Sequence, residues 1–264
     1  RKSFAHDQLL VNFVSSSSEL DSFDREAFKN LFEEEFKNRL GGLIHTVNDD
    51  VGDRPNAAEG ERFVLSGKEF VEEFIHGLRF EISIESFFQT NPASAERLYQ
   101  KALDYVQEDK PESKPVILDL FAGTGTITQL LAKAAPNAEV IGVEIVPEAV
   151  EDAKRSAKNN GLSTLQFFTA DVGKFLFDHP QYQNRIHTLT LDPPRAGIAP
   201  KTLRKVIRLG AERMVYISCN PATQARDMAT LAEFGYVLKK FSLVDQFPHT
   251  AHIESVALFE KTSR

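Results

Sequence analysis

The chain has 264 residues, a formal net charge of -7, 42% hydrophobic residues and 26% charged residues, values that fit a globular protein of one large domain or a main domain with a smaller one. Its single cysteine excludes an internal disulfide and any site built from several thiolates within this chain, which suits a reducing cytosol. No apolar run approaches the ~20 residues of a membrane span and no signal-peptide pattern opens the chain, so we expect a cytoplasmic protein without a membrane partner.

Residues 1–86 are predicted to form a small α/β domain. The expected elements are strands at 8–14, 43–47, 68–75 and 78–84, a helix at 24–40 ended by Gly41-Gly42, and a polar loop at 51–60. One stripe of the helix carries Phe28, Leu31, Phe32, Phe36 and Leu40. Helical spacing makes these side chains core residues, and we prefer that interpretation to a base-stacking surface.

Residues 85–91 join this domain to the rest of the chain. The segment reads Glu85-Ser86-Phe87-Phe88-Gln89-Thr90-Asn91 and is followed by a predicted helix at 93–107. Two aromatic and two amide side chains before a helix fit either a lid over a ligand or a hinge whose rings fill a domain interface. The local sequence leaves both interpretations open.

Residues 87–264 show the regular alternation of a parallel α/β sheet. Strands are expected at 116–120, 139–143, 165–169, 188–191 and 214–217, and helices at 127–134, 148–160, 202–209 and 222–234. Two further strands, 236–243 and 255–260, have no room for a helix between them, so we expect them to be antiparallel neighbours at one edge. The alternation predicts a mostly parallel sheet with helices on both faces.

A glycine-containing turn follows the first of these strands. It reads Asp119-Leu120-Phe121-Ala122-Gly123-Thr124-Gly125-Thr126, and glycines at such a turn let a ligand approach the backbone closely. Thr128 replaces the third glycine of a dinucleotide-binding motif, and no Gly-Lys-Ser/Thr follows as a P-loop requires. Glu144, after the second strand, could accept ribose hydroxyls, and Asp171, after the third, could reach an adenine amine.

This layout of acids around a Gly-x-Gly turn resembles that of S-adenosylmethionine-dependent methyltransferases. After the fourth strand the chain reads Asp192-Pro193-Pro194-Arg195, where relatives that methylate amines carry an aromatic residue in the last position. Arg195 therefore disfavours amine methylation. Methylation of a ring carbon such as uracil C5 needs a nucleophile that adds to C6 and a base that removes the C5 proton.

Cys219 is a candidate for that nucleophile. It follows the apolar run Met214–Ile217, at the end of a predicted strand, where α/β sheets bind their ligands. A lone cysteine is more often a small buried hydrophobe, and its immediate surroundings alone favour that interpretation.

Four motifs together resemble the RNA 5-methyluridine (uracil-C5) methyltransferase family. They are Phe88-Gln89-Thr90-Asn91, Asp192-Pro193-Pro194-Arg195-Ala196-Gly197, Ser218-Cys219-Asn220-Pro221-Ala222-Thr223 and Phe247-Pro248-His249-Thr250-Ala251-His252-Ile253-Glu254. The resemblance implies that Cys219 adds to C6, that Glu254 removes the C5 proton and that Asp192 assists. It also implies cofactor contacts, which are Gln89, Phe121, Gly123, Gly125, Thr126, Glu144, Asp171 and Asp192.

Some interpretations remain open beside this resemblance. Glu254 could be a surface acid, and Asp192-Pro193-Pro194 could be a plain strand end. His249 and His252 could be a metal pair, although the resemblance implies no metal here and a role for these histidines in shaping the loop. A basic stretch between Arg195 and Arg213 fits equally an RNA contact or an ordinary solvated helix face. Many family members begin with a small RNA-binding barrel, and one branch has a four-cysteine iron–sulfur site. This chain has neither, so we expect either a truncated piece or a protein that relies on other surfaces for RNA; the start at Arg1 fits a fragment of something longer.

The sequence therefore predicts a Rossmann-like class I methyltransferase fold with a mostly parallel seven-stranded sheet at 87–264 and a smaller α/β domain at 1–86, which is a candidate RNA contact. The expected activity is S-adenosylmethionine-dependent methylation of uracil C5 in ribosomal or transfer RNA by a monomer. The alternatives are a methyltransferase acting on another nucleic-acid base and a non-catalytic RNA-binding or RNA-folding module.

Overall fold

The computed structural model describes residues 1–18, 20–49, 60–108 and 114–262, and the chain divides into two compact units, Arg1–Pro92 and Ala93–Arg264. The predicted polar loop at 51–60 lies outside the described residues except for Gly60. No helix in the described ranges is long and apolar enough to cross a membrane.

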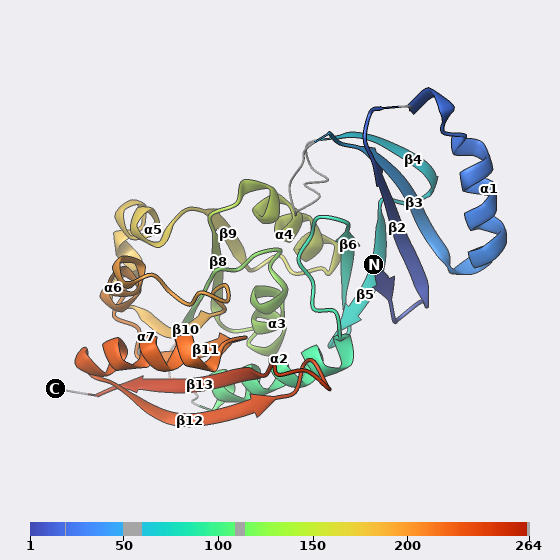
Figure 1. Cartoon of the computed structure of the whole chain (residues 1–264). Coiled ribbons are helices and arrows are strands. Elements are labelled where there is room, and N and C mark those ends of the chain that lie inside the picture. The colour runs from blue at the N-terminus through green and yellow to red at the C-terminus, as the bar shows by residue number, and fades with distance from the viewer. Residues whose placement is uncertain (19, 50–59, 109–113, 263–264) are drawn as a thin grey trace. The chain divides into compact units, whose positions relative to one another are not determined.

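The first unit combines a four-stranded sheet, ordered β1-β2-β3-β4, with a β5–β6 hairpin (Figure 1). The elements are β1 (Lys2–Ser3), β2 (Gln8–Ser15), α1 (Arg25–Phe36), β3 (Leu40–Val47), β4 (Glu61–Gly67), β5 (Phe70–Ile75) and β6 (Leu78–Ser83). Strands β2 and β3 are parallel and α1 connects them, whereas β3 and β4 are antiparallel. A small core joins the sheet to the hairpin through Leu10, Ile44, Val71 and Ile82.

Helix α1 is shorter than the sequence predicts, and β4 is a strand that the prediction missed. Gly41 and Gly42 lie in β3 instead of ending the helix. Position 42 requires glycine because a Cβ there would stand 1.9 Å from the backbone oxygen of Lys68. The core assignment of the α1 stripe was also too strong. Its phenylalanines are half-buried and contact one another with tilted rings, the centroids of Phe28 and Phe32 being 4.6 Å apart, while Leu31 is 62% exposed.

The second unit is built on a seven-stranded sheet in the order β12-β13-β11-β10-β7-β8-β9. Its strands are β7 (Val116–Leu120), β8 (Glu139–Glu144), β9 (Gln166–Thr169), β10 (Ile186–Leu191), β11 (Arg213–Ser218), β12 (Tyr236–Val244) and β13 (Glu254–Lys261). The first five are parallel, and β13 is antiparallel to both β11 and β12. The predicted antiparallel pair at one edge is confirmed.

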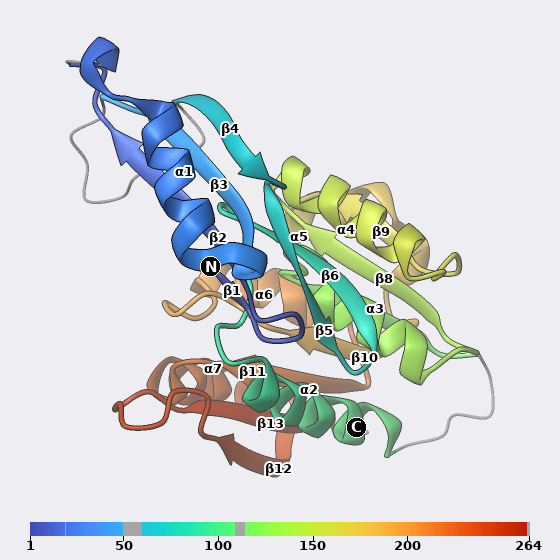
Figure 2. The same ribbon diagram turned by 90° about the vertical axis from the view of Figure 1, so that its right-hand side faces the viewer.

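Helices cover both faces of this sheet, with α2, α3 and α4 on one face and α5, α6 and α7 on the other (Figures 1 and 2). They are α2 (Pro92–Gln107), α3 (Thr126–Ala134), α4 (Pro147–Asn159), α5 (Val172–Asp178), α6 (Pro200–Arg208) and α7 (Pro221–Glu233). The sequence prediction missed α5, whose roughly two turns are too short for a periodic signal. The large core of the sheet includes Leu118, Leu189, Met214, Tyr216 and Phe259, all fully buried.

Candidate active site

The three residues predicted to be catalytic lie where the parallel strands of the seven-stranded sheet have their carboxyl ends; we call this the active-site edge. Asp192 follows β10 and Cys219 follows β11, and these parallel strands end together because Leu191 pairs with Tyr216. Glu254 begins β13, whose antiparallel register places Ser255 opposite Ser218. Extending that register by one residue beyond β11 places Glu254 opposite Cys219, and the charge of Glu254 acts on the thiol.

The three side chains differ in their exposure. Cys219 is half-buried and carries a free thiol, so it is not sealed in the core. Glu254 is only 3% exposed, and Asp192 is half-buried. Neither carboxyl group makes a side-chain hydrogen bond to another residue in the described part of the chain. Because a buried carboxylate without a partner is costly, two of them beside a thiol indicate a place for a polar ligand.

Burial makes all three groups harder to ionise, and the charges of neighbouring acids add to this for Asp192 and Cys219. Burial raises the pKa of Asp192 to about 8, and the charges of Glu254 and Asp119 add to this. Burial also raises the pKa of Glu254. The pKa of Cys219 is raised first by burial and then by the charges of Glu254 and Asp192. Cys219 is therefore mainly a protonated thiol near neutral pH, and its proton must leave when the sulfur forms a bond.

Arg195 supplies the opposing charge. Its guanidinium lowers the pKa values of both Cys219 and Glu254, against the effect of burial. Its Nη1 lies 3.2 Å from Nδ1 of His252, which stands two residues before Glu254. Sequence reasoning used Arg195 to disfavour amine methylation and as the start of a basic stretch, and it missed this electrostatic role. The available signal in the sequence was that Arg195 closely follows Asp192 at one strand end, while Cys219 lies at the end of the next strand.

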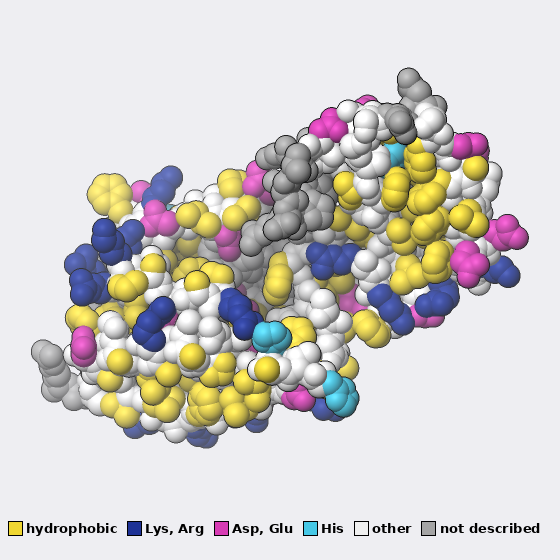
Figure 3. All heavy atoms as spheres, in the orientation of Figure 1, with side chains coloured by type: hydrophobic (Ala, Val, Ile, Leu, Met, Phe, Trp, Pro, Cys, Tyr) yellow, Lys and Arg dark blue, Asp and Glu magenta, His cyan; other side chains and the backbone are white. Residues whose placement is uncertain are grey.

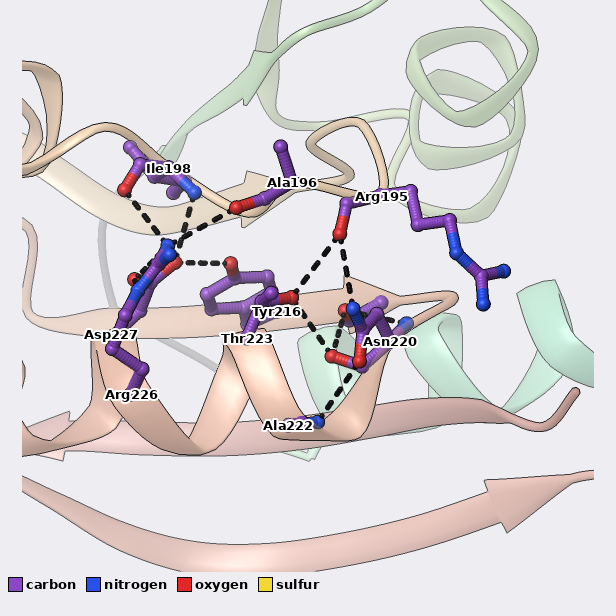
Figure 4. A network of polar contacts seen from close by, with 10 residues as sticks. Arg195, Ala196, Ile198, Tyr216, Asn220, Ala222, Thr223, Arg226 and Asp227 are labelled. Carbon is purple, nitrogen blue, oxygen red and sulfur yellow. Dashed lines mark hydrogen bonds and ion pairs between the residues drawn. The ribbon is translucent and has the colours of Figure 1, made fainter.

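A network of hydrogen bonds holds the loop that carries Asp192 and Arg195 (Figure 4). Asn220 Nδ2 donates to the backbone oxygen of Arg195 at 3.2 Å, while the Asn220 side chain also caps α7. Asp227, 2% exposed, accepts from the backbone N–H of Ile198 at 2.9 Å and from the Tyr216 hydroxyl at 2.8 Å. The network leaves the guanidinium of Arg195 extended away from it and ties the 192–198 loop to the helix after Cys219 (Figure 4).

The Gly-x-Gly turn between β7 and α3 has the backbone that close ligand approach needs. Gly123 and Gly125 have φ angles of 54° and 76°, and Phe121 adopts the same left-handed region at 62° although it has a side chain. Such a conformation in a bulky residue is strained and recurs at functional sites. A Cβ added to Gly123 would meet nothing within 4 Å, so this turn is open on one side.

Gly125 has a different, structural reason for lacking a side chain. A Cβ there would stand 2.7 Å from Cζ of Phe167 and 2.8 Å from Cβ of Ala153. Gly125 also caps α3, whose first residue is the half-buried Thr126. Asp119, the acid that opens the motif, is 1% exposed and accepts hydrogen bonds from Thr128 at 2.6 Å and Thr190 at 2.8 Å. Its carboxyl group therefore links the first turn of α3 to β10 below the ligand-facing side of the sheet end, and it takes no part in the open side of the turn.

Glu144 is positioned beside this turn by backbone donors. Its Oε2 accepts from the N–H of Gly123 at 2.9 Å, and its Oε1 accepts from Ile145 at 2.7 Å and Val146 at 3.0 Å. A carboxylate offers about four acceptor positions, so about one remains for a ligand hydroxyl. The turn and Glu144 together fit a ligand that combines a ribose with a group lying against the glycines.

Asp171 is exposed and already engaged at the start of α5. Its Oδ1 accepts from the N–H groups of Gly173 at 2.7 Å and Lys174 at 3.3 Å, and from Nζ of Lys205 at 3.2 Å. The backbone donors, followed by Lys205, hold its pKa below the ordinary value for aspartate. The carboxylate is thus ionised and fixed in position, with Oδ2 outside these contacts.

Two further predictions concern Gln89 and His249. Gln89 belongs to the first unit, where it lines a cavity of about 210 Å³ with residues that include Phe88 and Thr90, and its predicted cofactor contact stays a prediction. His249 adopts a left-handed φ of 66° in the loop before β13. Among the described residues, no group of three or more His, Cys, Asp or Glu side chains could hold a metal ion.

Comparison with known proteins places this chain in a family. A family model described as tRNA (uracil-5-)-methyltransferase matches residues 56–262. Relatives named "uncharacterized RNA methyltransferase" include one from Clostridium acetobutylicum, 37% identical over 99% of this chain and 55% of its own length. Another, from Chlorobaculum tepidum, is 40% identical over 99% of this chain and 53% of its own length. The chain thus spans about half the length of the curated relatives it matches.

Solved structures support the same assignment. The tRNA (uracil-54, C5)-methyltransferase of Pyrococcus abyssi, crystallised with S-adenosyl-L-homocysteine, aligns with a TM-score of 0.73 and 28% identity over 98% of this chain and 58% of that protein. A SAM-dependent methyltransferase from Agrobacterium tumefaciens aligns with a TM-score of 0.59 and 15% identity over 84% of this chain and 78% of that protein, which shows the shared fold. The second unit therefore has the class I methyltransferase fold, and the chain belongs to the tRNA (uracil-5-)-methyltransferase family.

Proposed function

We propose that this protein methylates C5 of a uridine in RNA, with S-adenosylmethionine as methyl donor. The observation that carries the proposal is the meeting of a half-exposed thiol with two carboxyl groups that no described side chain or backbone group satisfies. Cys219, Glu254 and Asp192 reach this place from three strand ends. A thiol and a base are what methylation of C5 requires.

The turn after β7 fits the proposed donor. S-adenosylmethionine carries a ribose and an amino-acid tail but no phosphate, so its site needs hydrogen-bond acceptors more than a lysine. In this proposal Glu144 accepts from the ribose, Asp171 from the adenine amine, and the open side of Gly123 lets the ligand lie against the backbone. Phe121, Gly125, Thr126, Asp192 and Gln89 complete the proposed contacts. The bound donor supplies an electrophilic methyl group.

Cys219 begins the reaction by adding its sulfur to C6 of the uracil. The thiol proton passes to solvent water as the C6–S bond forms, and the ring electrons move toward C5 and O4, which makes C5 nucleophilic. Because Arg195 lowers the pKa of Cys219, it favours loss of this proton against the burial that opposes it. C5 then takes the methyl group.

Glu254 completes the reaction as a base. The methylated C5 still carries its original hydrogen, and the Glu254 carboxylate removes this proton. The electron pair of the broken C–H bond restores the C5–C6 double bond and expels the Cys219 sulfur. The raised pKa of Glu254 makes its carboxylate a stronger base than an exposed glutamate, which suits this step. Asp192, whose pKa of about 8 keeps it largely protonated, could donate a hydrogen bond to the uracil.

A covalent adduct tests the proposal. RNA containing 5-fluorouridine is incubated with the protein and S-adenosylmethionine, and a protein–RNA band is sought on denaturing gels. Fluorine cannot leave as a proton, so the adduct should persist, and Cys219→Ala should abolish it. Arg155→Gln, a change on the exposed face of α4, serves as control and should keep the adduct.

Ordinary RNA tests the role of Glu254. Glu254→Gln should transfer the methyl group and then accumulate the adduct, because the C5 proton stays in place. Normal turnover by this variant would show that the base is another residue. No adduct with transfer or ribosomal RNA, under conditions where the protein binds S-adenosylhomocysteine, would contradict the proposed activity. Cytoplasmic location and a monomeric state stay predictions from the sequence.

A further inference from the structure

Helices α5 and α6 carry a cluster of cations that the proposed chemistry does not use. They pack against each other on one face of the large sheet. We call the following residues the α5–α6 surface: Lys174 and Phe177 on α5, and Lys201, Arg204, Lys205 and Arg208 on α6. Figure 3 shows Lys and Arg side chains gathered over this end of the second unit.

The basic stretch read from the sequence separates into different parts in the structure. Arg213 is 4% exposed and lies 3.4 Å from Glu260, so it belongs to the interior. Arg195 contacts His252 at the active site. The cations that remain are those on α6.

Helix α6 places these cations along a single exposed row. Leu203, Val206 and Ile207 face the core, whereas Lys201, Arg204 and Arg208 are exposed. The exposed residues are spaced three and four apart, which keeps them on one helix face. At 1.5 Å per residue the row is about 10 Å long.

The row is electrostatically unusual for this protein. Lys205 pairs with Asp171, but Lys174, Lys201, Arg204 and Arg208 form no ion pair or side-chain hydrogen bond with any other residue in the described ranges. By contrast, Lys154 and Arg155 on α4 are paired with acids of their own helix. A chain with a net charge of -7 that leaves four clustered cations without partners presents a site for a polyanion.

An exposed aromatic ring accompanies the cations. Phe177 is 84% exposed and lies three residues after Lys174 on the short helix α5. One exposed phenylalanine is ordinary, and it offers too little apolar surface for a protein core or a membrane. Together with a row of cations it matches the surfaces that bind single-stranded nucleic acid, where rings stack on bases and cations follow the backbone.

The surface continues directly from the active-site edge. Helix α6 starts at Pro200, immediately after the loop that carries Asp192 and Arg195. Helix α5 starts after Asp171, at the carboxyl end of β9, and the Lys205–Asp171 contact joins the two helices there. The cation row therefore runs from the edge that holds Cys219 along α6 toward Arg208.

We propose that the α5–α6 surface binds the RNA segment that flanks the target uridine, with Lys201, Arg204 and Arg208 contacting phosphates and Phe177 stacking on a base. The proposal rests on the proposed function for the identity of the partner. It assigns a binding role to residues that take no part in the chemistry.

Salt-dependent RNA binding tests the proposal. The triple variant Lys201→Gln/Arg204→Gln/Arg208→Gln is compared with Lys154→Gln/Arg155→Gln/Lys158→Gln, which makes the same charge change on α4. Affinity for uridine-containing single-stranded and stem-loop RNA is measured across a salt series. Each lost phosphate contact should reduce the slope of log affinity against log salt by about 0.7–0.9, so the α6 variant should lose about two. Phe177→Ala should weaken binding about fivefold or more without changing the slope.

The readouts separate this proposal from the proposed function. Adduct formation with a 5-fluorouridine trinucleotide, too short to follow the row, should be the same in the α6 variant and the unaltered protein. If the unaltered protein forms adducts but the α6 variant keeps its full affinity and slope, the inference is wrong and the activity stands. An equal loss in the α4 variant would also overturn it, since overall charge would then explain binding. The inference would also be wrong if the α6 variant lost binding to anionic lipid vesicles while its RNA binding was unchanged.

Discussion

The charges around Cys219 allow a sharp test, because it is the only cysteine in the chain and every alkylation event reports on it. Glu254 raises the pKa of this thiol after burial has done so, and Arg195 lowers it. Glu254→Gln should therefore increase the thiolate fraction at neutral pH, and Arg195→Met should decrease it. The two variants should move the reactivity of the same sulfur in opposite directions.

The magnitude follows from the strand register. Because the register continues to Glu254 opposite Cys219, we take about 6 Å for the distance between the carboxylate and the sulfur, close to the Cβ separation of about 4.5–5.5 Å in cross-strand pairs. At an effective dielectric constant of about 20–40 the repulsion is about 1–3 kcal/mol. Removing it should raise the alkylation rate near pH 7 by about 5- to 100-fold. Arg195 is exposed, so its effect is screened further and its loss should slow alkylation by about threefold.

The assay is the rate of iodoacetamide alkylation as a function of pH, with thiolate absorbance as a second readout. Arg155→Gln removes a cation from the exposed face of α4 and should leave the rate unchanged. A Glu254→Gln protein that reacts no faster than the unaltered protein, while its melting temperature is unchanged, would refute the placement of this carboxylate beside the thiol. An increase in both variants would point to altered access instead of charge.

Three further predictions concern stability and ligand binding. Because burial raises the pKa of Asp192 to about 8, the folded state keeps a proton that the unfolded state loses near pH 4. Stability should therefore fall as pH rises from 6 to 8, and the melting temperature should fall by about 2–4 °C for each kcal/mol. Asp192→Asn should reduce this fall. Gly125→Ala should destabilise the fold by about 1–3 kcal/mol because its Cβ meets Phe167 and Ala153. Gly123→Ala, with open space around it, should cost about 1–2 kcal/mol in backbone strain and mainly weaken S-adenosylhomocysteine binding. Thermal melting and titration calorimetry distinguish the two effects. Asp227→Ala leaves the Tyr216 hydroxyl and the Ile198 N–H unpaired and should cost about 2–4 kcal/mol in denaturant unfolding, while an unchanged midpoint would show that the network in Figure 4 contributes little.

Local pattern was a good guide to the second unit and a weaker one to the first. Parallel strands buried on both faces are continuous apolar runs, and β7, β10 and β11 stand out for that reason. In the first unit the half-buried α1 and the edge strand β4 bury less surface, so their boundaries depend on contacts distant in sequence. Gly42 shows this, because only the approach of Lys68 explains why it lies in a strand.

The sequence by itself determined which chemical groups are present and which strand each of them follows along the chain. A single thiol, a Gly-x-Gly turn and an acid before the last strand pointed to methyl transfer once four motifs were seen to resemble the uracil-C5 methyltransferase family, because the thiol by itself favoured a buried hydrophobe. Only the tertiary structure decided how these groups affect one another. The antiparallel register of β11 and β13 makes Glu254 the neighbour of Cys219, the hydrogen bonds around Asp227 and Asn220 hold the loop of Arg195, and burial shifts all three ionisations. Charge interactions depend on distance and dielectric surroundings, and both are properties of the folded chain.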